Sequence, residues 1–77
     1  MQLEILTPDA IIYNGEVISV SLPGLNGRFQ VLNNHAPIIS TLTSGEILIE
    51  TADKNIEKFE IKGGILEILK NKVIVLA

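Results

Sequence analysis

The sequence predicts an all-β fold in which short antiparallel strands form a flattened sandwich or barrel. Apolar residues recur at every second position, most clearly where Ile18, Val20 and Leu22 alternate with serines, and a period of two is that of a half-buried strand. Turn-forming residues interrupt the chain at short intervals, and no long pattern with helical spacing lies between them. Many short strands joined by tight turns favour two sheets that bury their inner faces against each other.

The predicted strands carry the branched and aromatic residues that strands favour. They are 3–7, 10–13, 18–22, 29–32, 38–43, 46–51, 58–62, 65–69 and 73–77. The turn signals between them include Pro8-Asp9, Asn14-Gly15, Asn26-Gly27 and Asn33-Asn34. Because 73–77 has no charged residue, we expect both faces of that strand to be covered, either within the fold or by something beyond it.

The alternation also predicts which side chains enter the core. Ile18 and Phe29 are expected there, so replacing either with alanine should destabilise the domain. Phe59 and Ile61, which alternate with charged residues, are expected on the inner face of their strand.

Size and composition predict one folded domain that covers residues 1–77. A chain of 77 residues is too short to be divided into two pieces that each close a core. Its content of 47% hydrophobic and 19% charged residues is that of a folded chain.

Charge and cysteine content exclude several classes of function. The chain has no cysteine, which excludes disulfides, thiolate chemistry and cysteine-ligated zinc. The net charge is −3 and the pI is about 4.9, so no basic patch favours nucleic acid as a partner. No apolar run reaches the roughly 18 residues that span a bilayer, and we expect membrane association only through a partner.

No residue pattern predicts a catalytic, cofactor or metal site. His35 is the only imidazole, and a transition-metal site would need further ligands that show no suitable spacing. Because His35 precedes Ala36-Pro37, we expect it in a loop, either satisfied by neighbours or at an interface. Catalysis by His35 is an alternative that would need a nucleophile and an orienting acid from elsewhere in the fold.

The glycines are interpreted as parts of turns. The stretch 23–28 resembles a phosphate-binding loop, but no helix pattern follows it to supply a positive N-terminus. Gly63-Gly64 is compatible with a bulge, a bend or the close approach of another backbone. The residues alone therefore predict a sandwich whose loops and sheet edges are its working surfaces.

The order of several segments adds a family resemblance that covers nearly the whole chain. They are LEILTPD at 3–9, GEV at 15–17, LPG at 22–24, GRFQVL at 27–32, NHAP at 34–37, GEI at 45–47, GGILE at 63–67 and VIVLA at 73–77. The combination of the proline-glycine turn, the histidine-alanine-proline segment, the double glycine and the last strand is distinctive. In this order the chain resembles the epsilon chain of rotary proton-translocating ATP synthase, called delta in mitochondria.

The resemblance implies a flattened sandwich of about ten strands that works without catalysis of its own. Such a domain is a rotor part of the central stalk, which joins the gamma shaft to the membrane ring of c subunits and couples proton-driven rotation to ATP synthesis. It would lie peripherally on the cytoplasmic face of the bacterial inner membrane. Gly27 and Arg28 would face the c-ring, whereas Thr7, His35 and Ser40 would lie on the gamma side.

The chain departs from the family pattern in two respects. Arg28 stands where members often have an acidic residue, so the contact with the ring is expected to use another charge. Many members continue into a two-helix hairpin that inhibits ATP hydrolysis, and no such hairpin is expected in the sequence that ends at Ala77. An alternative function is a stand-alone sandwich that binds a small ligand or a protein through the loops at 25–28 and 33–37.

Overall fold

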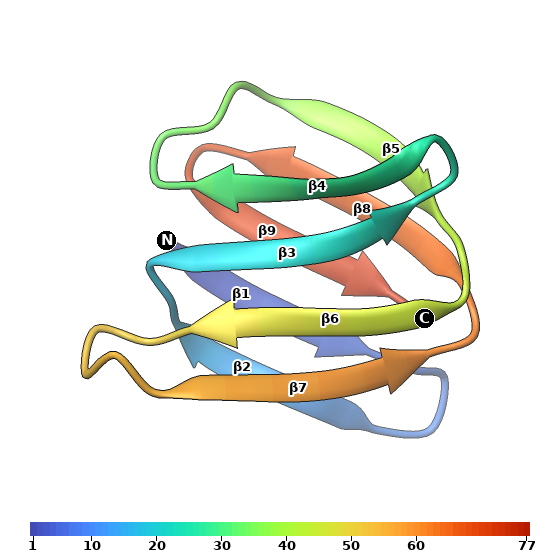
Figure 1. Cartoon of the computed structure of the whole chain (residues 1–77), viewed down its shortest axis with the longest axis horizontal. Coiled ribbons are helices and arrows are strands. Elements are labelled where there is room, and N and C mark those ends of the chain that lie inside the picture. The colour runs from blue at the N-terminus through green and yellow to red at the C-terminus, as the bar shows by residue number, and fades with distance from the viewer.

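Nine strands and their turns make up the computed structural model, which describes residues 1–77 and contains no helix (Figure 1). The strands are β1 (Gln2–Leu6), β2 (Ile11–Glu16), β3 (Ser19–Gly24), β4 (Gly27–Leu32), β5 (Ile38–Leu42), β6 (Gly45–Glu50), β7 (Ile56–Ile61), β8 (Gly64–Leu69) and β9 (Lys72–Leu76). The all-β prediction is confirmed, and each predicted strand corresponds to one of these nine.

The strands form two layers that are parts of one curled sheet (Figure 1). The front layer has the order β4-β3-β6-β7, and the back layer has the order β5-β8-β9-β1-β2. The two layers join where Gly24 of β3 pairs with Leu42 of β5. The sheet therefore curls over itself and buries the inner faces of most strands between the layers.

One pair of neighbours in the back layer is parallel. β1 and β9 pair in parallel from Gln2 opposite Lys72 to Leu6 opposite Leu76, whereas all other pairs are antiparallel. The prediction of an antiparallel fold did not include this pair. Its two strands are the first and last in the chain, so no hairpin turn dictates their relative direction.

The core between the layers is aliphatic. Fifteen buried residues form one cluster, and the partly buried rings of Tyr13, Phe29 and Phe59 pack against its margin. The period-two pattern is clearest in β1, where Leu3 and Ile5 are fully buried, and in β9, where Val73 and Val75 are. No disulfide contributes, so apolar burial between the layers is the main stabilising force.

The expected core position of Ile18 is wrong. Ile18 is 37% exposed, whereas Val17 is 2% exposed. The alternation begins only with β3, in which Val20 and Leu22 are buried as predicted. The two residues before it pass from the back layer to the front, and their amides are bonded to Met1 and Glu50 carbonyls at 2.9 and 2.8 Å. The chain turns at Ile18, so the strand period does not apply there.

The predicted turn at Asn14-Gly15 is also wrong. β2 continues through both residues to Glu16, with Asn14 opposite Glu4 and Gly15 opposite Leu3. The Asn14 side-chain oxygen accepts a hydrogen bond from the side-chain nitrogen of Gln2. Pairing with β1 along its full length therefore outweighs the local turn preference of the dipeptide.

The fold itself covers only the inner face of the last strand, and cover of its outer face from beyond the fold stays a prediction. β9 is central in the back layer, between β8 and β1. Its inner residues are buried, but Leu76 on the outer face is 53% exposed and Ile74 is only half-buried. The missing charges of this strand thus mark an apolar surface that remains open to solvent.

The contrast between Leu22 and Ile18 gives a stability test. Leu22→Ala removes a fully buried side chain and should lower the free energy of unfolding by about 2–5 kcal/mol. Ile18→Ala, in the exposed connection, should cost less than about 1 kcal/mol. Urea denaturation of both variants measures the difference, and equal losses would contradict the observed strand phase.

At the double glycine Gly63-Gly64, the backbone of Gly64 lies close to the backbone of Leu76. A Cβ on Gly64 would collide with the carbonyl oxygen of Leu76, and the φ angle of Gly64 is +156°. Gly64 begins β8 beside the end of β9, so a side chain here would push the two strands apart.

Gly64→Ala should therefore destabilise the domain by about 2–4 kcal/mol, since the obstacle is backbone that cannot move aside. Gly27→Ala is the matched control, because Gly27 has a φ angle of +119° but open space around it; its cost should be about 1 kcal/mol. Thermal melting monitored by circular dichroism compares the two, and similar melting temperatures would refute the steric explanation.

Candidate interaction surfaces

The five residues that the family resemblance singled out lie on four segments of the chain. Thr7 follows β1 at the end of the molecule where the β3–β4 turn also lies, and His35 precedes β5 at the opposite end (Figure 1). Ser40 is in the middle of β5, at the rim of the back layer. Gly27 and Arg28 begin β4 in the front layer.

The Thr7 turn is closed by its own side chain. The Thr7 hydroxyl accepts a hydrogen bond from the Ala10 amide at 3.1 Å, and the Thr7 amide donates to the Ala10 carbonyl at 2.9 Å. Threonine commonly stabilises turns in this way. The predicted turn at Pro8-Asp9 is thus confirmed, and Thr7 holds its shape.

The His35 loop is tied to two other parts of the chain. The Met1 ammonium group donates to the Asn33 side-chain oxygen at 2.6 Å, and the Asn34 amide donates to the Asn71 side-chain oxygen at 2.8 Å. His35 is half-buried, and its Nδ1 donates to the Ala36 carbonyl at 2.8 Å. These bonds hold His35 in a well-defined loop at the edge of the back layer.

Arg28 lies across the outer face of the front layer. Its Nη2 donates to the Ser21 carbonyl at 3.2 Å, the Ser21 hydroxyl at 3.1 Å and the Glu46 carbonyl at 2.7 Å. No carboxylate forms an ion pair with it. The guanidinium charge is therefore held in one position by two carbonyl oxygens and one hydroxyl, and it remains free to attract an acidic group.

A surface hollow joins three of the predicted site residues. It has a volume of about 440 Å³ and lies between the β3–β4 hairpin and β5. Gly27 and Arg28 line one side and Ser40 the other. The structure thus brings Ser40 beside the expected ring-side residues, whereas Thr7 and His35 are at opposite ends of the molecule.

The sequence analysis missed an exposed apolar surface on the back layer. Successive rows of the sheet place Leu6 opposite Leu76 and Leu76 opposite Ile65. We call the following six outward residues the apolar face: Leu6, Ile39, Ile65, Leu69, Ile74 and Leu76. The uncharged last strand was the signal in the sequence that pointed to it.

The outer face of the front layer is polar by comparison. Arg28, Gln30 and Ser21 lie on β4 and β3, and Glu46, Glu50, Lys58 and Glu60 lie on β6 and β7. Only Leu32, Leu48 and Ile56 interrupt this set. Because contiguous exposed apolar surface commonly marks an interaction site, the back layer is the stronger candidate for a large interface.

No group of three or more histidine, cysteine, aspartate or glutamate side chains gathers in one place. The chain forms no helix long and apolar enough to cross a bilayer.

An aromatic pair closes the rim between β2 and β7. The ring centroids of Tyr13 and Phe59 are 5.5 Å apart at an interplanar angle of 58°, which is a favourable edge arrangement. Burial raises the pKa of Tyr13 above its ordinary value of 10.0, and the negative charge of Glu57 raises it further.

These features define a small two-layer β-sandwich with one polar and one apolar outer face. The family model for the ATP synthase delta/epsilon chain β-sandwich domain matches residues 1–77. The chain belongs to this family, as its segment order indicated.

Curated relatives and solved structures agree with that membership. An ATP synthase epsilon chain of Sulfurimonas denitrificans is 50% identical over 76 residues, which are 99% of this chain and 58% of the relative. The epsilon chain of Chlorobium limicola is 43% identical over 75 residues, covering 97% of this chain and 85% of the relative. The chain thus spans little more than half of the first relative and most of the second.

The fold recurs in rotary ATP synthases at low sequence identity. A chain in the mitochondrial ATP synthase of Euglena gracilis, described with its F1 part and c-ring, superposes with a TM-score of 0.91 at 19% identity, over 97% of this chain and 48% of that one. A chain from the central stalk and c-ring of the Tetrahymena thermophila enzyme gives 0.83 at 16% identity, over 97% and 60%. At such identities the likeness establishes the fold alone.

The aromatic rim predicts a pH dependence. Because the folded state holds the Tyr13 proton more tightly than the unfolded chain does, its contribution to stability is complete below pH 10 and is lost as the pH rises through the folded-state pKa. Tyr13 is the only tyrosine, so the ultraviolet absorbance of its phenolate follows it directly. Glu57→Gln should lower the pKa of Tyr13 while leaving it above the ordinary value. Titration of Tyr13 at its ordinary value in the folded protein would contradict the burial of the ring.

Proposed function

We propose that this domain is a non-catalytic rotor subunit of the central stalk of ATP synthase. It links the gamma shaft to the membrane ring of c subunits, so that proton-driven rotation is coupled to ATP synthesis. Family membership supports this role, as do relatives described as ATP synthase epsilon chains. A subunit with this role is peripheral to the membrane and is held on the cytoplasmic face of the bacterial inner membrane by its partners.

The observation that carries the proposal is the difference between the two outer faces. A free-standing sandwich gains nothing from the exposure of Ile39 and Leu76, which are 74% and 53% exposed, because exposed apolar area costs free energy in water. A subunit that is permanently docked buries that area in the assembly. The apolar face therefore suits a large and lasting contact, for which we propose the gamma subunit.

Two of the three residues assigned to the gamma side, Thr7 and His35, fit a contact along the outer face of the back layer, whereas Ser40 pairs with the buried Leu66 and lies on the inner side of β5. Thr7 follows β1, His35 precedes β5 and Ser40 is within β5, so all three belong to the back layer or its connections. Thr7 and His35 are at opposite ends of that layer, with the apolar face between them. A gamma surface that covers the length of the layer would reach both.

The ring-side contact is proposed for the β3–β4 hairpin in the front layer. The turn before Gly27 is exposed and tight, and Arg28 presents a charge held by three hydrogen bonds. A short hairpin of this kind suits a polar contact with the loops of the c-ring. The two partners would thereby meet different layers of one rigid sandwich and would rotate as a unit.

Binding to the cognate gamma subunit is the test of the proposed role. The folded chain should form a stoichiometric complex with gamma in size-exclusion chromatography, because the apolar face can contribute to an interface of about 1,000 Å² or more. Failure of the folded chain to bind gamma would sink the proposal. A ligand-binding sandwich would then be the better interpretation, with the hollow of about 440 Å³ as its candidate site.

Arg28→Glu tests the ring contact separately. Because Arg28 is exposed, the reversal should change the free energy of unfolding by no more than about 1 kcal/mol. It should weaken binding of the chain–gamma complex to isolated c-ring by about tenfold, since a charge at a contact acts on association. Lys58→Glu makes the same charge change on the same face away from the hairpin and is the control; equal effects of both on c-ring affinity would contradict the placement of the contact.

A further inference from the structure

Glu67 is a carboxylate without an ionic partner within the apolar face, whereas Glu4, on the other side of Ile74, is paired with Lys72. In the sheet register Glu67 lies directly between Ile39 of β5 and Ile74 of β9. On its own strand the outward neighbours are Ile65 and Leu69. Four apolar side chains thus surround the carboxylate, which forms no ion pair or hydrogen bond with the rest of the chain.

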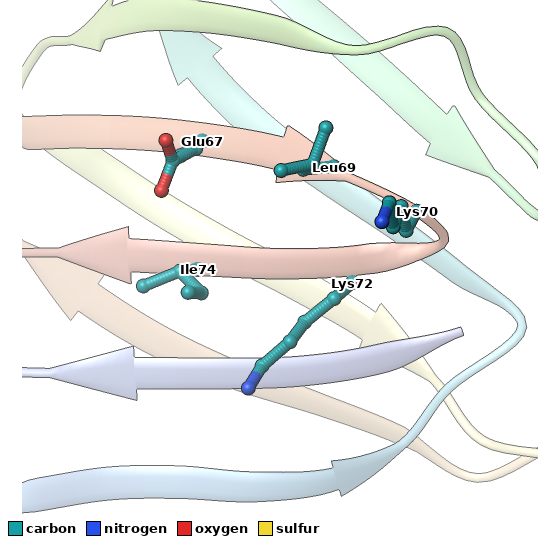
Figure 2. A pocket seen from close by; sticks show the side chains of 5 residues that line it. All are labelled: Glu67, Leu69, Lys70, Lys72 and Ile74. Carbon is teal, nitrogen blue, oxygen red and sulfur yellow. The ribbon is translucent and has the colours of Figure 1, made fainter.

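The nearest basic side chain on the same face is already engaged. Lys72 lines the same hollow as Glu67, but its Nζ is 3.6 Å from a Glu4 oxygen. Figure 2 shows the Lys72 side chain extending from β9 toward β1, away from Glu67. Lys70 is in the turn at the end of the hollow rather than beside the carboxylate. The charge of Glu67 is therefore satisfied by water while the face is open.

Covering the apolar face removes that water. An ionised carboxylate buried without a partner is costly, whereas one that meets a guanidinium or ammonium group with good geometry is tolerated and fixes the register of the contact. Any partner that covers this face must therefore supply a basic group at one position, or lose affinity there.

The shape around Glu67 suits a helix. Two hollows of about 300 and 240 Å³ lie on either side of β8, and Glu67 and Leu69 line both. Glu67 and Leu69 thus form a ridge between two grooves. Side chains on one face of a helix can pack into such grooves.

We propose that the apolar face docks an amphipathic helix of the gamma subunit that carries one arginine or lysine among apolar residues, and that this basic group pairs with Glu67. The inference rests on the proposed function and names the recognition chemistry of its larger interface. Charge complementarity favours this occupant over a second copy of the chain. The chain has a net charge of −3, and its apolar face offers no free basic group at its centre to meet a second Glu67.

Replacement of Glu67 distinguishes a basic partner from an apolar one. Glu67→Leu enlarges the apolar face, so it would strengthen binding to a purely apolar helix. Opposite a basic residue it leaves that charge buried and unpaired, and the dissociation constant for gamma should rise by about tenfold or more. Glu67→Gln should also raise the dissociation constant for gamma. Isothermal titration calorimetry with the full-length gamma subunit measures the dissociation constants of the unmodified chain, Glu67→Leu and Glu67→Gln.

Glu46→Gln is the matched control. It removes one negative charge from an exposed β6 residue on the front layer, so it has the same effect on net charge and should leave the affinity unchanged. Because Glu67 and Glu46 are both exposed, the variants should fold, which circular dichroism melting verifies.

The possible outcomes separate the proposed function from the inference about a basic partner. Absence of binding by the unmodified chain would overturn the proposed function itself. Normal binding by the unmodified chain with equal or tighter binding by Glu67→Leu would overturn only the inference about a basic partner. Dimers of the chain in analytical ultracentrifugation that become tighter in Glu67→Gln would show that a second copy occupies the face, and would also overturn it.

Discussion

The structure depends on β3 more than on any other strand. β3 pairs with β4 and β6 in the front layer and, through Gly24, with β5 in the back layer. Its side chains Val20 and Leu22 are fully buried, so it contributes to the core while it joins the two layers. The aliphatic core has no disulfide to assist it, and so the curled sheet is held by burial around this strand. The same burial fixes the outer surfaces, because each outward side chain is next to buried side chains on its own strand.

The same alternation produces two outer faces with different chemistry. The front layer turns Arg28, Glu46 and Lys58 to solvent, whereas the back layer turns Ile39, Ile65 and Leu76 outward. One rigid body can therefore present a polar hairpin to one partner and an apolar sheet to another. Such a division of surfaces suits the proposed connecting role, in which the subunit moves together with both partners. The carboxylate of Glu67 adds selectivity to the apolar sheet, because exposed apolar area alone does not distinguish one partner from another.

Particular residues show how far sequence reasoning reached. Val20 and Leu22 alternate with serines, and Phe59 and Ile61 alternate with charged residues; this alternation correctly predicted the inner faces of β3 and β7, because strand period is a local property. Ile18 fitted the same alternation but lies in a connection between layers, and Asn14-Gly15 had turn chemistry but is paired along β1. The segment order predicted the family, which the family model confirmed. It did not predict that Ser40 shares a hollow with Gly27 and Arg28, whereas Thr7 and His35 are far apart.

The sequence by itself determined the strands and most of the turns, because alternation and turn-forming residues are encoded between near neighbours in the chain. It also determined the family, through the order of segments along the whole chain. Only the tertiary structure decided the parallel pairing of β1 with β9, which brings together the two ends of a 77-residue chain. The same holds for the apolar face and the position of Glu67 at its centre, since Ile39, Glu67 and Ile74 come from three strands. Strand order is set by burial summed over the whole core, and no local pattern specifies which outward residues will become neighbours.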